Sequence, residues 1–136
     1  MLVSETRIVV RYSETDQMGS AHHAQFFNWI DTARADYFKC LGFRYKEIEA
    51  AGIVCPVVHV EAKYHWPAYY DDEVILKTRL AAFTRVKLDF RIDVFGPEDR
   101  KLVTARTVLG VLDREKRRPK VIPENIQLKF KEAMEN

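Results

Sequence analysis

The pattern of hydrophobic and polar positions along this chain first indicates one long amphipathic helix near the N-terminus. Between Gln25 and Gly42, apolar residues recur at the three-to-four-residue spacing of one helix face: Phe26, Ile30, Ala33, Tyr37 and Leu41. Charged residues fall on the other faces, and Gly42 stands where a helix C-terminal cap belongs. The pattern therefore predicts a helix that is buried along one side.

The rest of the chain alternates apolar and polar positions, which predicts antiparallel strands joined by short turns. The runs are Thr6 to Tyr12, Ile53 to Trp66, Glu73 to Phe83, Val86 to Phe95 and Lys101 to Leu112. In the second run the apolar residues share one face, so we expect that strand to be half-buried. Helices are also expected from Tyr45 to Ala51 and after Pro123. These elements predict an α+β fold, with the long helix laid across a curved antiparallel sheet of about five strands.

Composition favours one domain over residues 1–136, because 47% hydrophobic residues supply enough apolar material for a core. Twenty-two basic and twenty acidic residues leave a net charge of +2, so nucleic acid is not an expected partner. No apolar run approaches the ~18 residues of a membrane-spanning helix, and the charged N-terminus does not resemble a signal peptide. We therefore expect a cytoplasmic protein in which Cys40 and Cys55 are reduced, buried thiols.

The predicted strands are long for a chain of 136 residues. One large helix covers a single face of the sheet, which leaves apolar surface and a strand edge without a partner. Association would cover both, so we expect a homo-oligomer, a dimer at least.

The best candidate for chemistry is Asp16, in the polar, glycine-containing turn before the long helix. Its carboxylate is ionised at neutral pH and can attack an acyl carbon or activate a water. The helix that follows presents unpaired N–H groups and a positive dipole end, which can stabilise a developing oxyanion. Asp16 can equally be an ordinary turn or capping acid, and its spacing leaves both roles open.

The four histidines are weaker candidates. His22 and His23 suggest general-base catalysis or metal ligation, but the remaining two, His59 and His65, lie on the polar face of a strand. We therefore expect no metal, and we place His22 and His23 in the first turn of the long helix, where the backbone N–H matters more than the ring. No nucleophile elbow, phosphate-binding glycine loop or dinucleotide fingerprint is present, so no cofactor is expected.

Basic residues gather at two places. Arg85 and Lys87 flank a tight connection between two strands, and further arginines and lysines cluster between 114 and 120. Both groups are candidate contacts for substrate phosphates, and ordinary charged surface is the alternative. The 114–120 run has no interleaved aromatic residues, which argues against RNA binding.

Five segments together resemble a known family. They are RYSETDQMG at 11–19, HAQFF at 23–27, Ala33-Arg34, Leu41-Gly42 and PAYYDD at 67–72. In order and over nearly the whole chain, they are similar to the signature of the 4-hydroxybenzoyl-CoA thioesterase family. This is a group of hotdog-fold acyl-CoA thioesterases that includes the thioesterase associated with the Tol–Pal system. The resemblance implies a hotdog fold, a long helix wrapped by a curved antiparallel sheet.

The resemblance also implies a site. The family's catalytic acid falls on Asp16, and the N–H that polarises the thioester carbonyl falls on the backbone of His23. Tyr12 and Gly19, on either side of the acid, are expected to bind substrate together with Arg85 and Lys87. Subunits of this family form a homodimer or homotetramer, and strand residues of the partner shape the acyl pocket.

The chain departs from the family pattern at three positions. His22, Gln25 and Tyr69 stand where tyrosine, asparagine and arginine are common. These changes leave the catalytic acid in place and bear on substrate preference, which in this family spans aromatic, short and longer acyl groups.

Together these residues predict an acyl-CoA thioesterase that releases a free acid and CoA, with Asp16 as nucleophile or as base for a water. Two alternatives stay open. A hotdog dehydratase needs a histidine with an acid on the long helix, where Asp31 and Asp36 have no such partner. A non-catalytic hotdog dimer would bind acyl-CoA or another protein, and intact Asp16 argues against it.

Overall fold

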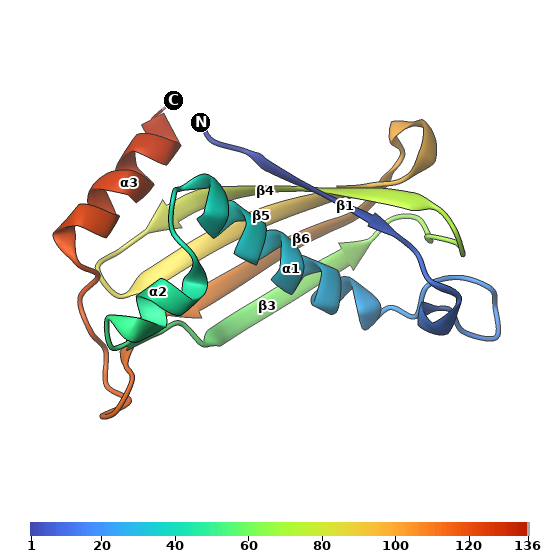
Figure 1. Cartoon of the computed structure of the whole chain (residues 1–136). Helices are drawn as coiled ribbons and strands as arrows, with labels where there is room; N and C mark the ends of the chain where they lie inside the picture. Colours follow the sequence, from blue (N-terminus) through green and yellow to red (C-terminus); the bar gives the residue numbers. More distant parts are fainter. Residues whose placement is uncertain (136) are drawn as a thin grey trace.

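The computed structural model describes residues 1–135 and contains a five-stranded antiparallel sheet with a long helix across one face (Figure 1). The strands lie in the order β1-β4-β5-β6-β3. They are β1 (Ser4–Val9), β3 (Val57–Tyr64), β4 (Glu73–Phe83), β5 (Lys87–Phe95) and β6 (Lys101–Gly110). Two short strands, β2 (Ile53–Val54) and β7 (Leu112–Asp113), pair separately. The predicted α+β class and the antiparallel sheet are confirmed.

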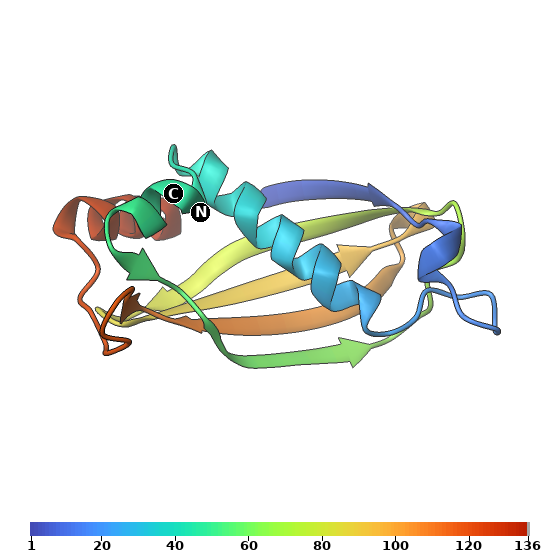
Figure 2. The same cartoon turned by 60° about the horizontal axis from the view of Figure 1, so that its bottom comes forward.

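The long helix α1, Gln25–Cys40, lies where the apolar spacing predicts it. Its buried residues are Phe26, Trp29, Ile30, Ala33, Tyr37 and Phe38. The helix runs diagonally across the strands (Figure 2). Gly42 adopts φ 95°, a left-handed conformation, and its N–H donates to the Lys39 carbonyl at 3.0 Å. The glycine cap is therefore also confirmed.

The central strands alternate between a buried face and a charged face, as predicted. The buried residues, which face α1, are Val74, Leu76, Thr78 and Leu80 of β4 and Leu88, Phe90, Ile92 and Val94 of β5. The register places Leu76 beside Val94 and Thr78 beside Ile92, so that buried residues meet across strands. The sheet thus has a dry face under α1 and a polar outer face.

The strand predicted from Ile53 to Trp66 differs from its expectation in two ways. It breaks around Pro56, which has no N–H to donate to a ladder. Its apolar residues on the α1 side are also exposed, with Val57 44% and Val60 43% accessible, and a bulge between Val57 and His59 turns Val58 to the outer face. The reason is topology, because β3 is the outermost strand and α1 packs chiefly on β1 and β4 at the other side of the sheet. The prediction of a half-buried strand is therefore wrong for the single chain.

The first strand, predicted from Thr6 to Tyr12, instead begins at Ser4 and ends before Tyr12. β1 ends at Val9, and Tyr12–Glu14 form a short 3-10 helix, η1. The ladder with β4 ends at the Val9–Glu73 pair, and one further contact follows, in which the Val10 N–H donates to the Asp72 carbonyl at 2.9 Å. This departure from the sheet directs the next segment toward the start of α1.

Smaller elements complete the fold. These are α2 (Tyr45–Ala50), the 3-10 helix η2 (Pro97–Asp99) and α3 (Glu124–Glu135). The final helix is confirmed over 124–135, and Asn136 lies outside the described residues. No helix within residues 1–135 is both long enough and apolar enough to cross a membrane.

The two cysteines differ in environment. Cys55 is buried, and burial raises the pKa of its thiol to about 11. Cys40 is exposed, so the expectation that both thiols are buried is wrong for this residue. It is the last residue of α1, where the helix end no longer faces the core.

Candidate active site

The loop that carries Asp16 is held in a defined turn. The Asp16 carbonyl accepts the Gly19 N–H at 3.0 Å, and its Oδ1 accepts the Met18 N–H at 2.9 Å. Gly19 adopts φ 81°, a conformation that strongly favours glycine. The Asp16 side chain is exposed, and its Oδ2 accepts no hydrogen bond from residues 1–135. The carboxylate is thus oriented through one oxygen and open through the other.

Two residues earlier, the buried carboxylate of Glu14 anchors this loop to α1. Glu14 Oε2 accepts the Trp29 Nε1–H at 2.9 Å, and Oε1 accepts the Arg11 N–H at 2.8 Å. Burial raises the pKa of Glu14, but these hydrogen bonds and the Arg11 guanidinium outweigh burial and hold the pKa below its ordinary value. Sequence reasoning missed this role. The available signal was Trp29 in the predicted helix, because a buried indole N–H needs an acceptor.

The two arms of the loop pair with each other at its base. The His22 N–H donates to the Glu14 carbonyl at 2.8 Å, and Thr15 forms a β-bridge with Ala21. Asp16 follows the last of these pairs directly. The pairing therefore fixes the acid relative to the arm that enters α1.

The PAYYDD segment, 67–72, closes the loop from the other side. The Ala21 N–H donates to the Ala68 carbonyl at 2.8 Å, and Ser20 forms a β-bridge with Tyr69. Segments that are far apart in the sequence, and that carry the family resemblance, thus meet around one loop.

The start of α1 supplies free backbone donors. His22 and His23 precede the helix rather than forming its first turn, which corrects the prediction, and Ala24 is its N-terminal cap. Their carbonyls accept the N–H groups of Gln25, Phe26 and Phe27. Within residues 1–135, no hydrogen-bond acceptor meets the N–H of His23 or Ala24. Two adjacent N–H groups at the positive end of a helix suit a carbonyl oxygen that gains negative charge.

The other residues expected around the acid lie on the same loop or beside it. Tyr12, in η1, is 77% exposed, and its ring stands edge-on to that of Tyr70 with centroids 5.6 Å apart. Its carbonyl accepts the Thr15 N–H, and Gly19 forms the turn after Asp16. The structure therefore brings Tyr12, Asp16 and Gly19 together.

Arg85 and Lys87 are not part of this group within one chain. They flank the turn that joins the end of β4 to β5. Asp16 instead follows β1, whose last residue, Val9, pairs with Glu73 at the start of β4. The two basic residues and the acid consequently lie at opposite ends of the sheet.

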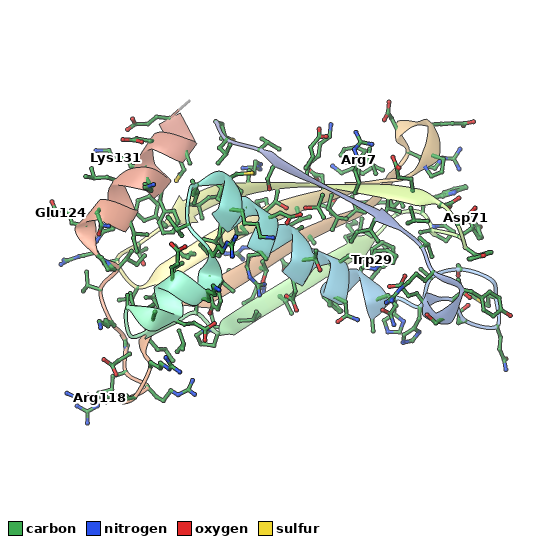
Figure 3. The ribbon with its side chains drawn as sticks, in the orientation of Figure 1. Arg7, Trp29, Asp71, Arg118, Glu124 and Lys131 are labelled. Atoms are coloured by element: carbon green, nitrogen blue, oxygen red, sulfur yellow. The ribbon has the colours of Figure 1, made fainter. Side chains whose placement is uncertain are left out.

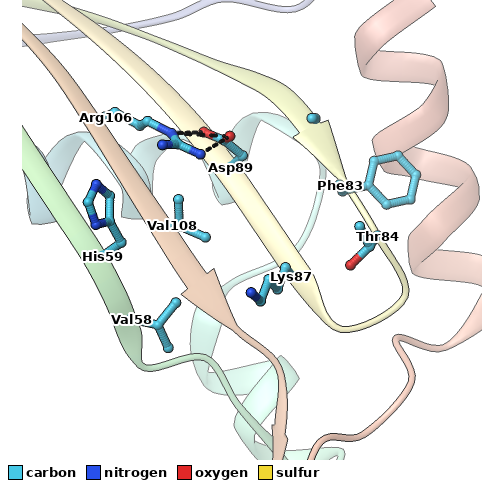
Figure 4. A pocket seen from close by; sticks show the side chains of 9 residues that line it. Val58, His59, Phe83, Thr84, Lys87, Asp89, Arg106 and Val108 are labelled. Atoms are coloured by element: carbon cyan, nitrogen blue, oxygen red, sulfur yellow. Dashed lines mark hydrogen bonds and ion pairs between the residues drawn. The ribbon is translucent and has the colours of Figure 1, made fainter.

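Lys87 lines a hollow of about 390 Å³ on the outer face of the sheet (Figure 4). Arg106 lies in the same hollow and binds Asp89, with Nη2–Oδ2 at 2.9 Å and Nε–Oδ1 at 3.2 Å. This ion pair raises the pKa of Arg106, whose positive charge is paired with Asp89. Lys87, which has no ion pair within residues 1–135, remains available to an anion.

The predicted basic cluster lies on the exposed loop after β7. Arg118 in this loop lies at the opposite end of the molecule from Asp71 (Figure 3). Asp113 shapes the loop, because its Oδ1 accepts the N–H groups of Lys116 and Glu115, both at 2.9 Å, which lower the pKa of Asp113. The cluster thus shares its end of the molecule with the β4–β5 turn.

Comparison with known proteins identifies the family. Residues 10–130 match the family described as the thioesterase-like superfamily. The chain is 31% identical over 119 residues to "Putative acyl-CoA thioesterase YneP" of Bacillus subtilis (strain 168), covering 88% of this chain and 86% of that protein. It is 24% identical over 123 residues to the acyl-CoA thioester hydrolase YbgC of Escherichia coli O6:H1, covering 90% and 92%.

A solved structure agrees with this family. The DHNA-CoA thioesterase from Staphylococcus aureus superimposes with a TM-score of 0.92 at 27% identity, covering 97% of this chain and 91% of that one. The fold is therefore the hotdog fold of thioesterases. The chain belongs to the thioesterase-like superfamily.

Proposed function

We propose that this protein is a cytoplasmic, single-domain acyl-CoA thioesterase of the 4-hydroxybenzoyl-CoA thioesterase group, which includes the Tol–Pal-associated thioesterases. The observation that carries the proposal is the oriented, exposed carboxylate of Asp16 in the loop that leads to the free N–H groups of His23 and Ala24. Relatives named as acyl-CoA thioesterases support the choice of reaction.

Thioester hydrolysis needs an attacking oxygen and stabilisation of the carbonyl oxygen as it becomes negative. The N–H groups of His23 and Ala24 stabilise the negative carbonyl oxygen, and one such donor typically contributes ~3–4 kcal/mol in the transition state. Asp16 supplies or activates the attacking oxygen. Its oxygen either bonds to the acyl carbon, giving an anhydride that water then opens, or removes a proton from the attacking water. Both routes break the C–S bond and release CoA, whose thiolate takes up a proton, while Tyr12 and Gly19 contact the acyl group.

We further propose a homodimer joined through β3. This edge strand exposes Val57, Val60 and Tyr64 on the side of α1, an apolar surface that a second copy would bury. Pairing two β3 edges antiparallel about a two-fold axis lays the start of one strand beside the end of the other. Tyr64 is the last residue of β3 and contacts the His23 backbone. The start of the partner subunit's β3 therefore comes close to this site and helps to cover it.

The same arrangement would give the distant basic residues a role. The registers of β3, β6, β5 and β4 place the start of β3 and the β4–β5 turn at one end of the sheet. In the dimer, the partner subunit's Arg85 and Lys87 approach the end that carries Asp16, together with its 114–120 loop. We propose that they attract the anionic phosphates of CoA.

Release of free thiol from a panel of acyl-CoAs tests the proposed activity. The panel is acetyl-, octanoyl-, palmitoyl-, benzoyl- and 1,4-dihydroxy-2-naphthoyl-CoA, the last because relatives carry its name. We expect the wild-type protein to hydrolyse at least one of them and Asp16→Asn to lose that activity. Asp31→Asn, which changes an exposed acid on α1, is the matched control and should keep it.

Four results would contradict the proposal. Turnover of none of the five thioesters would remove the activity, and binding without thiol release would favour the non-catalytic acyl-CoA-binding dimer. Turnover that survives Asp16→Asn would leave a thioesterase with another catalytic group. Loss of thiol release in Asp31→Asn would point to an acid on the helix as the catalytic group.

A further inference from the structure

Tyr64 links the outer strand to the first residues of the long helix. Its hydroxyl donates a hydrogen bond to the backbone carbonyl of His23 at 2.9 Å. Its ring stands edge-on to the rings of His23 and Phe26, with centroids 6.3 and 5.5 Å apart. Because Tyr64 ends β3, one side chain joins the sheet edge to the segment that carries the free N–H groups.

The peptide unit determines what this hydrogen bond controls. A peptide bond is planar, so the His23 carbonyl and the Ala24 N–H form one rigid group. Fixing the carbonyl therefore also fixes the direction of the Ala24 N–H. A donor on the carbonyl oxygen also polarises the peptide and strengthens its N–H as a donor. The Phe26 N–H reaches the same oxygen at only 3.3 Å, which leaves Tyr64 as the shorter contact.

We infer that Tyr64 is a positioning residue that aims the Ala24 N–H, beside the N–H of His23, at the thioester carbonyl. The inference rests on the proposed function and adds to its site a residue that touches the peptide instead of the substrate. Sequence reasoning placed Tyr64 on the apolar face of a strand and gave it no role in the site.

Tyr64→Phe tests the inference, because it removes the hydroxyl and keeps the ring. Tyr64 is 43% exposed, so the variant should fold. With the panel acyl-CoA that the wild type hydrolyses fastest, we expect kcat to fall about tenfold, and at least threefold, while KM stays within about twofold. Tenfold corresponds to ~1.4 kcal/mol. The loss falls on kcat because the donor acts most strongly on the oxyanion of the transition state.

The carbonyl stretching frequency supplies a readout that general loosening of the fold would not move. The Asp16→Asn variant should bind the acyl-CoA without hydrolysing it, so the infrared band of a ¹³C-labelled thioester carbonyl can be followed. This carbonyl band should shift to lower frequency on binding. Adding Tyr64→Phe should reduce this shift, because one donor is then poorly aimed.

Tyr45→Phe is the matched control. The Tyr45 hydroxyl accepts the Cys55 N–H at 2.8 Å, so the variant also removes one contact between a tyrosine hydroxyl and the backbone. It should lower stability but keep kcat within about twofold of the wild type.

Several results would overturn the inference. They are a kcat for Tyr64→Phe within threefold of the wild type, an unchanged carbonyl shift, an equal loss in Tyr45→Phe, or a loss that accompanies dissociation of the oligomer. A wild-type protein that hydrolyses none of the panel would remove the proposed function and this inference with it. That result differs from an active enzyme that is indifferent to Tyr64.

Discussion

The carboxylate of Glu14 accepts a hydrogen bond from the indole nitrogen of Trp29 at 2.9 Å and so ties the loop of Asp16 to α1. Glu14 is 5% exposed and Trp29 3%, so water cannot readily replace either partner. Hydrogen bonds to charged groups contribute about 1.5–3 kcal/mol, roughly twice the neutral kind. This contact therefore holds the acid in place relative to the helix N-terminus.

Glu14→Gln should destabilise the protein by about 1–3 kcal/mol at pH 7, because the amide removes the charge and turns an N–H₂ group toward existing donors. Urea denaturation measures this change. Glu5→Gln is the matched control, because Glu5 is an exposed acid on the neighbouring strand with ion pairs only at the surface. Its effect should stay within about 0.5 kcal/mol, and an equal loss in both variants would argue against the buried contact.

The difference in unfolding free energy between the wild type and Glu14→Gln should depend on pH. The pKa of Glu14 lies below its ordinary value of 4.5 in the folded protein, so its ionised form stabilises the fold. This contribution is complete above about pH 4.5 and is lost as the pH falls through the lower, folded-state pKa. The stability gap between wild type and Glu14→Gln should therefore narrow below pH 4.5. A gap that stayed constant from pH 7 to pH 3 would mean that the charge of Glu14 is not its source.

Elements that depend on local pattern could be predicted from the sequence. The helix α1 and the strand Glu73–Phe83 lie where periodicity places them, because α1 buries one face along its length and the strand buries alternate residues from Val74 to Leu80. The exposure of β3 could not be predicted in the same way. The exposure depends on strand order. An alternating sequence such as Val57–Tyr64 has the same pattern whether a helix, a partner subunit or water covers its apolar face.

The candidate site was predictable only in part, for a similar reason. Asp16 and the backbone of His23 came from a local motif and its resemblance to a family. The contacts that orient them join positions far apart in the sequence: Glu14 with Trp29, and Tyr64 with His23. A local pattern can show that the Trp29 indole needs an acceptor, but it does not identify Glu14 as that acceptor or Tyr64 as the partner of His23.

A charged residue in the apolar edge of β3 should disrupt the proposed dimer. Light scattering on the wild type should give twice the chain mass of 15.9 kDa or a higher multiple. Val60→Lys should shift the protein toward the monomer and lower activity with it, because two edges would then place like charges together. Leu128→Lys changes an equally exposed apolar residue on α3 and should do neither. A monomeric wild type at micromolar concentration would exclude both the dimer and a two-subunit site.

Charge reversal should weaken CoA binding if basic residues of the partner contact its phosphates. For Arg85→Glu combined with Lys87→Glu, we expect KM for an acyl-CoA to rise about tenfold at low salt, with a smaller rise at high ionic strength. The N-acetylcysteamine thioester of the same acyl group lacks the phosphates, so its KM should not change. Lys131→Glu, on the exposed side of α3, controls for net charge. If the double variant left KM unchanged from the wild type for both the acyl-CoA and the N-acetylcysteamine thioester, Arg85 and Lys87 would be ordinary surface charges.

The ranking of Asp16→Asn against His23→Ala tests the chemistry most directly. Asn keeps the size of Asp16 and can still accept the Met18 N–H, but it loses the charge and the nucleophilic oxygen. We expect kcat to fall by two to four orders of magnitude, about 3–5 kcal/mol, with KM nearly unchanged.

His23→Ala should be much milder, because the proposed donor is the backbone N–H, which alanine retains, and the imidazole is exposed at the start of α1. Steady-state kinetics on both variants, with circular dichroism to confirm folding, gives the ranking. The wild-type His23 ring also lies against that of His22, tilted by 54° with centroids 4.3 Å apart, and the loss of that contact costs little at an exposed site. If His23→Ala folded normally but abolished turnover while Asp16→Asn stayed nearly active, the imidazole would be the catalytic group and the carboxylate a turn acid.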